Sequence, residues 1–299
     1  MRDLDLTSLR LFVAVCETGN IARAGEQEHI VASAISKRLA QLENTVGAAL
    51  LVRGRRGVLP TPAGLALLEH ARAMHASVGR IERDLAAYAS GIKGHVRILA
   101  SASSIAESLP EDVALFLQDP AHRDIQVDME ERVSAEVVRG LKDGSASVGV
   151  CWDVADFEDL ASRPYRSDHL AVVTHPGHAL ATRKTLRFEQ TLGYDHVGLP
   201  PSSAVQIMLQ RAAAMAGKPL AYRAVVSTFD AAMRVVRANL AICVVPREVA
   251  EPYAQVLGLT VIPLTDAWAK RRFAICFRAY ASLSPAARLL TDHLVAQAR

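Results

Sequence analysis

Cysteine is scarce in this chain of 299 residues, which contains only four copies. They are Cys16, Cys151, Cys243 and Cys276. They lie far apart and each sits within an apolar pattern, so their spacing fits neither a zinc site nor a disulfide framework. We therefore expect buried structural thiols in a reducing cytoplasm.

Long apolar runs are also missing, and none approaches the roughly 20 residues that a membrane helix needs. The first residues carry acidic side chains and no cleavage pattern, so they do not resemble a secretory signal. These absences predict a cytoplasmic protein without a membrane partner. Charge of one sign does not dominate either, because 34 basic and 31 acidic residues give a net charge of +3. Nucleic-acid binding must therefore be judged from local patterns.

Motifs of the common enzyme classes are absent. The sequence has no phosphate-binding loop, dinucleotide-binding glycine motif, nucleophile elbow or paired C-x-x-C. One close histidine pair, His175 and His178, encloses Pro-Gly without a nearby cysteine or carboxylate, which favours a turn over a metal site. We expect no enzyme activity, no cofactor and no metal.

Two short helical patterns joined by a few residues occupy positions 20–43, which is typical of a helix-turn-helix. In the second pattern Ile35, Leu39 and Leu42 share one apolar stripe with Val46, and the opposite face is polar. Small residues, hydroxyls, amides and a lysine suit the DNA major groove. The candidate DNA-contacting residues on this face are Ser33, Ser36, Lys37 and Gln41. An ordinary amphipathic surface helix is the alternative.

A β-hairpin is predicted at positions 50–59, where two apolar runs flank a turn of glycine and arginine. Arg53, Arg55 and Arg56 fall at its tip. There they could contact phosphate or enter a minor groove as the wing of a winged helix. A solvated charged loop is the alternative.

The order of several short motifs resembles the LysR-type transcriptional regulators. The motifs are Leu9-Arg10-Leu11-Phe12, Arg23-Ala24, Ala34-Ile35-Ser36-Lys37, Leu42-Glu43, Gly47 and Thr61-Pro62-Ala63-Gly64. The resemblance is close over about the first 90 residues and architectural beyond them. The chain departs from the family at Val31 and Ala32, where Ser-Gln is usual, and at Pro60, where leucine is usual. Base readout should then depend more on Ser33 and Ser36. Because some relatives sense redox state through cysteine, such a role for Cys151 or Cys243 is an alternative to structural thiols.

A long helix is predicted from position 62 to about 90, opened by Thr61 as N-cap and Pro62 in the first turn. Its apolar residues alternate steps of four and three, the 3.5-residue repeat of a coiled coil. The seam comprises Leu67, Ala71, Met74, Val78, Ile81, Leu85 and Tyr88. We expect this seam to pair two subunits, the alternative being a helix packed on its own domain. In the family the linker helix pairs subunits, which implies a homodimer or homotetramer on dyad-related half-sites.

From position 95 the pattern changes to alternating strands and helices, which predicts a parallel, doubly wound sheet. Expected strands include 96–100, 125–130, 147–151, 170–173, 224–227 and 240–245, with a helix at 104–118. The fold class is α/β: an N-terminal winged helix-turn-helix at 1–61, a linker helix at 62–90 and an effector-binding domain at 94–299. The last resembles a two-lobe periplasmic-binding-protein fold, with lobe I at about 94–165 and 267–299 and lobe II at about 166–266.

Hydroxyl side chains follow the strands of this domain, at positions where helix N-termini favour anions. The candidate effector-binding residues are Ser101, Ser103, Ser104, Arg132, Ser134, Ser202, Ser203, Thr228 and Phe229, with Ser227 beside them. The resemblance implies an effector site at the same turns. Each hydroxyl could instead cap its helix, and Arg132 could pair with Glu130 or Glu131 rather than with a ligand carboxylate.

The sequence thus predicts a regulator that binds double-stranded promoter DNA and a small organic anion, with RNA polymerase as a further partner. A metabolite-binding protein or enzyme whose N-terminal helices serve only assembly is the rival. The arginine-rich tip at Arg53 to Arg56 argues against that rival, since oligomerisation does not need it. An architectural DNA binder would not need a domain of about 205 residues after the linker.

Overall fold

The computed structural model describes residues 4–54, 57–89, 94–153, 155, 157 and 159–298. Contacts divide the chain into two units, one formed by 1–91 with 142–145 and the other by 92–141 with 146–299. We call them the N-terminal and C-terminal units and describe each by itself. No helix within the described ranges has the length and apolar character that crossing a membrane requires.

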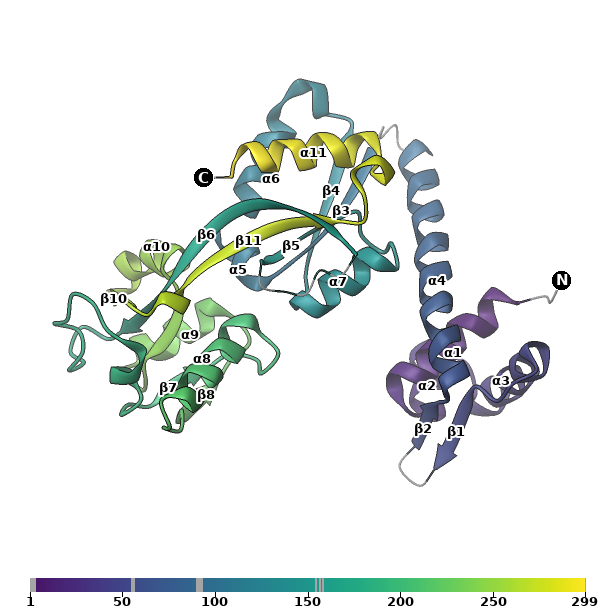
Figure 1. Cartoon of the computed structure of the whole chain (residues 1–299), viewed down its shortest axis with the longest axis horizontal. Coiled ribbons are helices and arrows are strands. Elements are labelled where there is room, and N and C mark those ends of the chain that lie inside the picture. The colour runs from purple at the N-terminus through teal and green to yellow at the C-terminus, as the bar shows by residue number, and fades with distance from the viewer. Residues whose placement is uncertain are drawn as a thin grey trace. The chain divides into compact units, whose positions relative to one another are not determined.

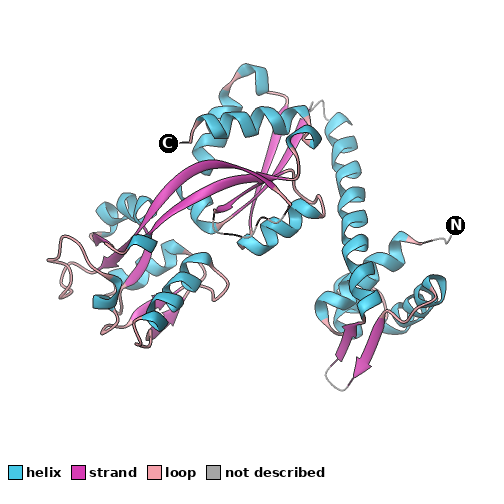
Figure 2. Ribbon diagram, viewed as in Figure 1, coloured by secondary structure: helices cyan, strands magenta, loops and turns pink. Residues whose placement is uncertain are grey.

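In its described residues the N-terminal unit combines four helices and a small antiparallel sheet (Figures 1 and 2). In chain order its elements are α1 (Leu6–Thr18), α2 (Ile21–Glu28), α3 (Ala32–Val46), β1 (Leu51–Gly54), β2 (Gly57–Pro60) and α4 (Pro62–Ala89). Asp5 caps α1 by accepting from the Ser8 backbone N–H at 3.0 Å, and Asn20 caps α2 by accepting from that of Ala22 at 2.8 Å. These side chains satisfy amides that the first turn leaves free.

Two glycines hold the hairpin against the turn between α1 and α2. Gly19 ends α1 in the left-handed region at φ 62°, and its carbonyl accepts from the Val58 N–H at 2.9 Å. A Cβ on Gly57 would lie 2.4 Å from the Gly19 carbonyl oxygen, so only glycine fits at this contact. The predicted hairpin is therefore present, with Leu51 opposite Pro60.

The core of the N-terminal unit is made by the apolar faces of α1, α3 and α4. Its buried members include Phe12, Val15, Ile35, Leu39 and Leu42. Three of the four residues predicted for the apolar stripe of α3 are thus buried, and the fourth, Val46, packs against them. Burying one face of α3 leaves its polar face in solvent.

The C-terminal unit contains two lobes joined by long strands. Its elements are β3 (Gly94–Ala100), α5 (Ala102–Glu107), α6 (Leu109–Gln118), β4 (Ile125–Glu131), α7 (Ser134–Lys142), β5 (Val148–Trp152), β6 (Ala161–Thr174), β7 (His196–Gly198), α8 (Ala204–Met215), β8 (Tyr222–Val225), α9 (Phe229–Arg237), β9 (Cys243–Pro246), α10 (Arg247–Leu257), β10 (Thr260–Pro263), β11 (Lys270–Phe277) and α11 (Pro285–Ala296). Short 3₁₀ turns lie at Pro120–His122, Phe188–Thr191, Ala267–Ala269 and Tyr280–Ser282.

One sheet of seven strands runs through both lobes in the order β10-β6-β11-β5-β3-β4, with β9 also paired to β6. β4, β3 and β5 are parallel, as predicted, but β11 and β6 are antiparallel to their neighbours, so the sheet is mixed. Figure 1 shows β6 and β11 side by side between the lobes. The two-lobe α/β fold is confirmed. The expectation of a wholly parallel sheet is wrong, because the two strands that connect the lobes, β6 and β11, run antiparallel to their neighbours.

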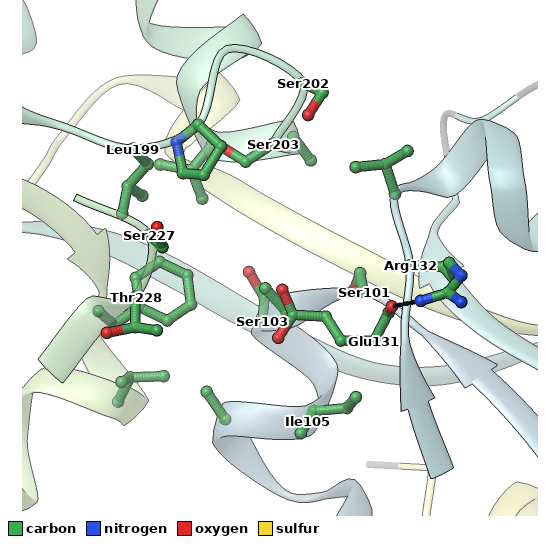
Figure 3. Close-up of a pocket in the computed structure, with 18 of the residues that line it drawn as sticks. Ser101, Ser103, Ile105, Glu131, Arg132, Leu199, Ser202, Ser203, Ser227 and Thr228 are labelled. Atoms are coloured by element: carbon green, nitrogen blue, oxygen red, sulfur yellow. Dashed lines mark hydrogen bonds between the residues drawn. The ribbon is translucent and has the colours of Figure 1, made fainter. Parts of the chain in front are cut away.

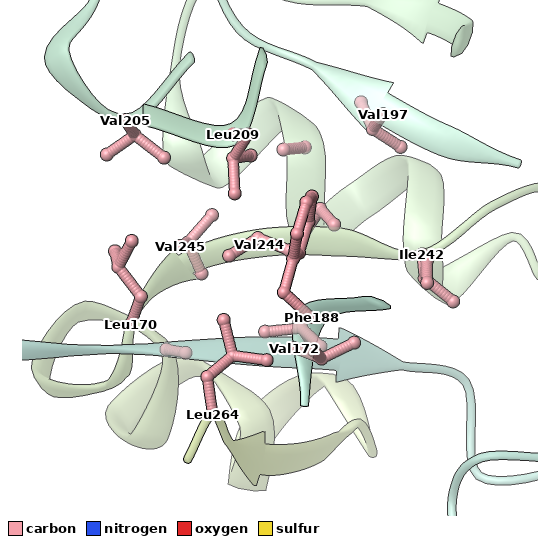
Figure 4. Close-up of a cluster of buried hydrophobic side chains, with 14 of the residues drawn as sticks. Leu170, Val172, Phe188, Val197, Val205, Leu209, Ile242, Val244, Val245 and Leu264 are labelled. Carbon is pink, nitrogen blue, oxygen red and sulfur yellow. The ribbon is translucent and has the colours of Figure 1, made fainter. Parts of the chain in front are cut away.

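Each lobe has its own apolar core. In the first lobe α6 and α11 cover β3, β5 and β11, and buried residues there include Phe116, Ile275 and Leu290. In the second lobe, residues from β6, β9, α8 and α9 surround Phe188 (Figure 4). Separate cores allow the lobes to act as distinct bodies around a shared cleft.

Candidate functional site

The outer face of α3 is accessible to solvent at the positions that were predicted to contact DNA. Ser33, Lys37 and Gln41 are exposed, and Ser36 is half-buried. Ser33 and Ser36 line a shallow groove of about 400 Å³ together with Asn20 and Gly54. Helix α3 and the hairpin thus meet along one surface, which a nucleic-acid groove could occupy.

The first turn of α3 lacks a side-chain cap. Its N-cap residue is Val31, whose side chain cannot accept from the free amides and is 71% exposed. This agrees with the departure from the family noted at Val31. Arg38 on the same helix turns away from the polar face and pairs with Asp5 at 2.9 Å.

Of the three hairpin arginines, only Arg53 is among the residues that the structure describes. Arg53 belongs to β1, where its backbone pairs opposite Val58. Arg55 and Arg56 lie outside the described residues. Their predicted contact with DNA therefore stays a prediction.

The proposed seam on α4 divides into two parts. Ala71 is buried in the core of the N-terminal unit and Leu67 packs against it. Assigning Ala71 to a subunit interface was therefore wrong, because the first turns of α4 are held by α1. Farther along, Met74, Ile81 and Leu85 are exposed by 41%, 58% and 64%. Val78 is half-buried, and the Tyr88 side chain is not among those described.

The candidate effector residues meet in one cavity of the C-terminal unit, with a volume of about 410 Å³ (Figure 3). All the predicted residues except Ser104 line it. Those that do are Ser101, Ser103, Arg132, Ser134, Ser202, Ser203, Ser227, Thr228 and Phe229. In Figure 3, Ser103 and Glu131 come from one lobe and face Leu199 and Ser227 from the other.

Ser104, which was predicted to contact the effector, does not line the cavity. It is buried and its hydroxyl lies 2.8 Å from that of Ser101, so it supports the first turn of α5 rather than facing the cavity. The spacing of the serines after β3 could not distinguish Ser101 from Ser104, since residues three apart lie on the same face of a helix.

Several of the hydroxyls also cap helices, which was the alternative to ligand binding that the sequence left open. Ser203 accepts from the Gln206 N–H at 3.3 Å, and Thr228 accepts from the Ala231 N–H at 3.2 Å. Ser101 accepts from the Ser104 N–H at 3.4 Å. A hydroxyl that caps one helix still has a free lone pair or proton, so capping and ligand binding are compatible here.

Arg132 is engaged by its own neighbours. It makes an ion pair with Glu130, and it donates to the Glu131 carbonyl at 2.9 Å. Figure 3 shows its guanidinium pointing away from the hydroxyls of the cavity, whereas the Glu131 carboxylate points toward them. Glu136 and Asp230 also line the cavity. This arrangement does not favour Arg132 as the partner of an anion.

A buried polar network lies behind Ser103 and was not predicted. Arg271 on β11 is 1% exposed, and its Nε donates to Asp168 on β6 at 2.8 Å. Its Nη2 donates to the Ser103 hydroxyl at 3.0 Å. Burial and the neighbouring Asp168 raise the pKa of Glu107 to about 10, so this side chain is protonated at neutral pH. The network joins α5 to both crossover strands.

The sequence contained one signal for this network. Arg271 lies between exposed Lys270 and exposed Arg272 in a strand whose other residues are apolar. Alternation along a strand then turns Arg271 to the opposite face from its two neighbours. A buried arginine needs a carboxylate, but the sequence does not identify Asp168 among the many acids.

The cysteines of the C-terminal unit are buried. Burial raises the pKa of Cys243 to about 12, and a hydrogen bond with Cys151 together with burial raises the pKa of Cys276 strongly. Protonated thiols react slowly, which favours the structural interpretation. In the described part of the chain, no group of three or more His, Cys, Asp or Glu side chains could hold a metal ion.

Comparisons with known proteins agree with both halves of this architecture. Residues 6–65 match the model of the bacterial regulatory helix-turn-helix protein, lysR family, and residues 89–299 match that of the LysR substrate binding domain. The RuBisCO operon transcriptional regulator of Allochromatium vinosum is 23% identical over 295 residues, covering 99% of this chain and 97% of that protein.

Two solved structures share the fold. Full-length CbnR complexed with its target DNA aligns with a TM-score of 0.66 at 24% identity, over 99% of this chain and all of that one. The effector binding domain of QuiR in complex with shikimate aligns with a TM-score of 0.60 at 18% identity, over 69% of this chain and 97% of that one. These structures show the fold, and the two family models, which together match most of the chain, show that it belongs to the LysR family of transcriptional regulators.

Proposed function

We propose that this regulator reads promoter DNA with the polar face of α3 and responds to a small organic acid held between the lobes of its C-terminal unit. The observation that carries the proposal is the pair of surfaces described above. One is an exposed helix face beside a hairpin, and the other is a cavity lined with hydroxyls from both lobes.

For DNA, the proposed roles follow from side-chain chemistry. Lys37 would neutralise phosphate, as would Arg53, Arg55 and Arg56. Ser33, Ser36 and Gln41 would approach base edges. The complex of CbnR with its target DNA supports this use of the fold.

For assembly, the exposed apolar residues Met74, Ile81 and Leu85 of α4 support a homodimer, or a tetramer of two such dimers. Pairing through α4 would relate two α3 helices by a dyad and so favour a palindromic operator. Contact with RNA polymerase would follow binding next to a promoter.

For the effector, the hydroxyls of Ser101, Ser103, Ser203 and Ser227 suit a polar ligand. QuiR, whose effector domain binds the hydroxylated acid shikimate, supports this class of ligand. Closing the cleft around it would alter the packing of C-terminal units within the oligomer and thereby DNA bending.

The test is fluorescence anisotropy of the full-length protein with DNA from upstream of its own gene, at several salt concentrations and with scrambled DNA as competitor. We expect tight, salt-dependent binding that survives the competitor. Absence of binding at every salt concentration would favour a metabolite-binding protein whose N-terminal helices serve only assembly.

A further inference from the structure

A second hollow adjoins the hydroxyl-lined cavity, and it is larger and of a different chemistry. Its volume is about 860 Å³, and the two hollows share Val133, Ser134, Ser202 and Ala204 at their border. All of its lining residues belong to the C-terminal unit. We call it the tryptophan groove, because Trp152 and Trp268 both line it.

Apolar side chains make the walls of the tryptophan groove. Helix α8 presents Ile207, Met208 and Met215, of which Ile207 and Met215 are eight residues apart and share one face of the helix. Ile207 and Met215 are 48% and 84% exposed, so they leave apolar surface open to the groove. Flat indole rings beside such surface favour a planar apolar ligand.

Cations outnumber acids among the described residues that line the groove. These cations are Arg211, Lys270 and Arg272, and Asp153 is the one acid among those described residues. Asp153 pairs with Arg272 at 2.9 Å, which leaves Arg211 and Lys270 to meet an anion. The hydroxyl-lined cavity has the opposite balance, because Arg132 is paired with Glu130 and Asp230 with Arg234, which leaves the acids Glu131 and Glu136.

Strand geometry explains why the cations gather here. Lys270 and Arg272 are two residues apart on β11, so both project from the face opposite to buried Arg271. That face opens on the groove, while the Arg271 face closes on Asp168. The position of these cations is therefore set by the same strand that joins the lobes.

We propose that the tryptophan groove binds the aromatic acid end of the effector, with its ring beside Trp152 and Trp268 and its carboxylate at Lys270 and Arg211. The inference rests on the proposed function and deepens it, because it narrows the small organic acid to an aryl carboxylate. Polar substituents of the same ligand reach the hydroxyls across the shared border. The anion-binding role expected for Arg132 passes to Lys270 and Arg211.

The chain offers a direct readout, since its two tryptophans both line the groove. We would titrate the full-length protein with benzoate while recording tryptophan emission, and measure affinity for benzoate and 2-naphthoate by calorimetry. Benzamide keeps the ring without the charge, and cyclohexanecarboxylate keeps the charge without the ring. We expect saturable changes in emission with benzoate and binding at least about tenfold weaker for either analogue.

Substitutions separate this site from other surfaces. Lys270→Gln and Arg211→Gln change exposed side chains, so the fold should survive, and each should weaken binding of both acids by about tenfold or more. Lys184→Gln removes an exposed charge outside the groove and should leave the affinity unchanged. Trp152→Phe removes one of the two indoles of the groove, so it should reduce both the change in emission and the affinity for the aryl acids.

The outcomes distinguish the inference from the proposed function. If neither aryl acid binds, or if both bind equally well to the Lys270→Gln and Arg211→Gln variants, the inference is overturned. Sequence-specific DNA binding in the anisotropy experiment would then still stand. If the aryl acids bind as expected but DNA does not, the groove is an aryl-acid site and the proposed regulatory function fails.

Discussion

The ion pair of Arg271 with Asp168 illustrates how one residue can control the stability of the C-terminal unit. Both side chains are almost wholly buried, at 1% and 0% exposure. Asp168→Ala would leave an uncompensated guanidinium inside the protein, which costs about 3–5 kcal/mol. Urea unfolding followed by tryptophan emission measures this unit alone, because Trp152 and Trp268 both belong to it.

The matched control for that prediction is the exposed pair of Arg247 with Glu251, at 45% and 52% side-chain exposure. Arg247→Ala should change the free energy of unfolding by about 0–1 kcal/mol, since water screens such pairs. Equal effects of the two substitutions would show that the buried network does not carry stability.

His196 makes the stability of the C-terminal unit depend on pH. Burial lowers its pKa from 6.5 to about 4, so the folded protein keeps the imidazole neutral. Below pH 6.5 the unfolded chain binds a proton first, and stability falls as the pH drops toward 4, by up to about 3 kcal/mol. His196→Gln should remove this part of the acid slope in urea titrations at several pH values. An unchanged slope would contradict the assignment.

Only some of the residues that line the cavity could be predicted from the sequence. The position of Thr228 and Ser203 at the cavity could be predicted, because both are hydroxyl residues that follow strands, which is a local pattern. Glu131, Leu199 and Tyr253 line the same cavity, yet each belongs to a different segment and carries no local signal. Lobe packing brings them together, and a single sequence does not encode that juxtaposition in any short pattern.

At the scale of the helix, different residues of α3 should determine the affinity for DNA and the preference for its sequence. Lys37→Ala should weaken binding to operator and scrambled DNA alike and lower the salt slope by about one unit. Ser33→Ala and Ser36→Ala should instead change the ratio between the two DNAs. Anisotropy titrations at several salt concentrations measure both quantities.

Arg38→Ala is the matched control for these α3 variants. Arg38 is a cation on the same helix, but it pairs with Asp5 and turns away from the polar face. Its loss should leave DNA affinity within about twofold. If Arg38→Ala weakens binding as much as Lys37→Ala, the polar face of α3 is not the surface that meets DNA.

Helix α4 should hold subunits together through its exposed apolar residues. Ile81→Glu and Leu85→Glu place charges in the expected seam, so the oligomer should dissociate to monomers at micromolar concentration in sedimentation velocity. Leu65→Glu is the control, because Leu65 is 56% exposed on the same helix but off the heptad repeat. Dissociation by Leu65→Glu alone would place the interface on another face.

Helices and strands were predicted best where a regular pattern of apolar residues extended over many positions. The pattern of α4 and the hairpin matched the structure, whereas one expected helix at 104–118 is two, α5 and α6. Pro110 explains the break, since its ring clashes with the preceding turn of a continuous helix. Helix α10 was missed, and it contains Pro252. Strand β6 begins at Ala161, nine residues before the expected strand, because its polar first half lies on β11 rather than in a core.

At the scale of the whole molecule, the two-lobe fold was predictable because strands and helices alternate along the chain. The mixed sheet was not, since antiparallel pairing of β11 with β5 joins residues more than a hundred positions apart. The tryptophan groove belongs to this scale as well. Trp152 is the last residue of β5, Trp268 precedes β11 and Arg211 lies on α8, so only the assembled lobes give the groove its charge and its walls.

Coupling between ligand and DNA is the last expectation at this scale, and it follows from linkage. If an aryl acid changes the affinity for operator DNA by some factor, DNA must change the affinity for that acid by the same factor, about fivefold or more for ordinary allosteric coupling. We expect calorimetric titrations of benzoate to differ between the free protein and its operator complex. The factor should equal the one that benzoate produces in DNA anisotropy.

Two variants make the coupling test selective. Lys270→Gln should abolish the effect of benzoate on DNA affinity while leaving DNA binding itself intact, because Lys270 lines the groove and not the surface of α3. Lys37→Ala should weaken DNA binding but leave the affinity of the free protein for benzoate unchanged. If benzoate and operator both bind wild-type protein with affinities independent of each other, the groove is a ligand site without control over DNA. The signal must then come from a ligand that closes the lobes differently, since only a ligand with unequal affinity for two states can shift the balance between them.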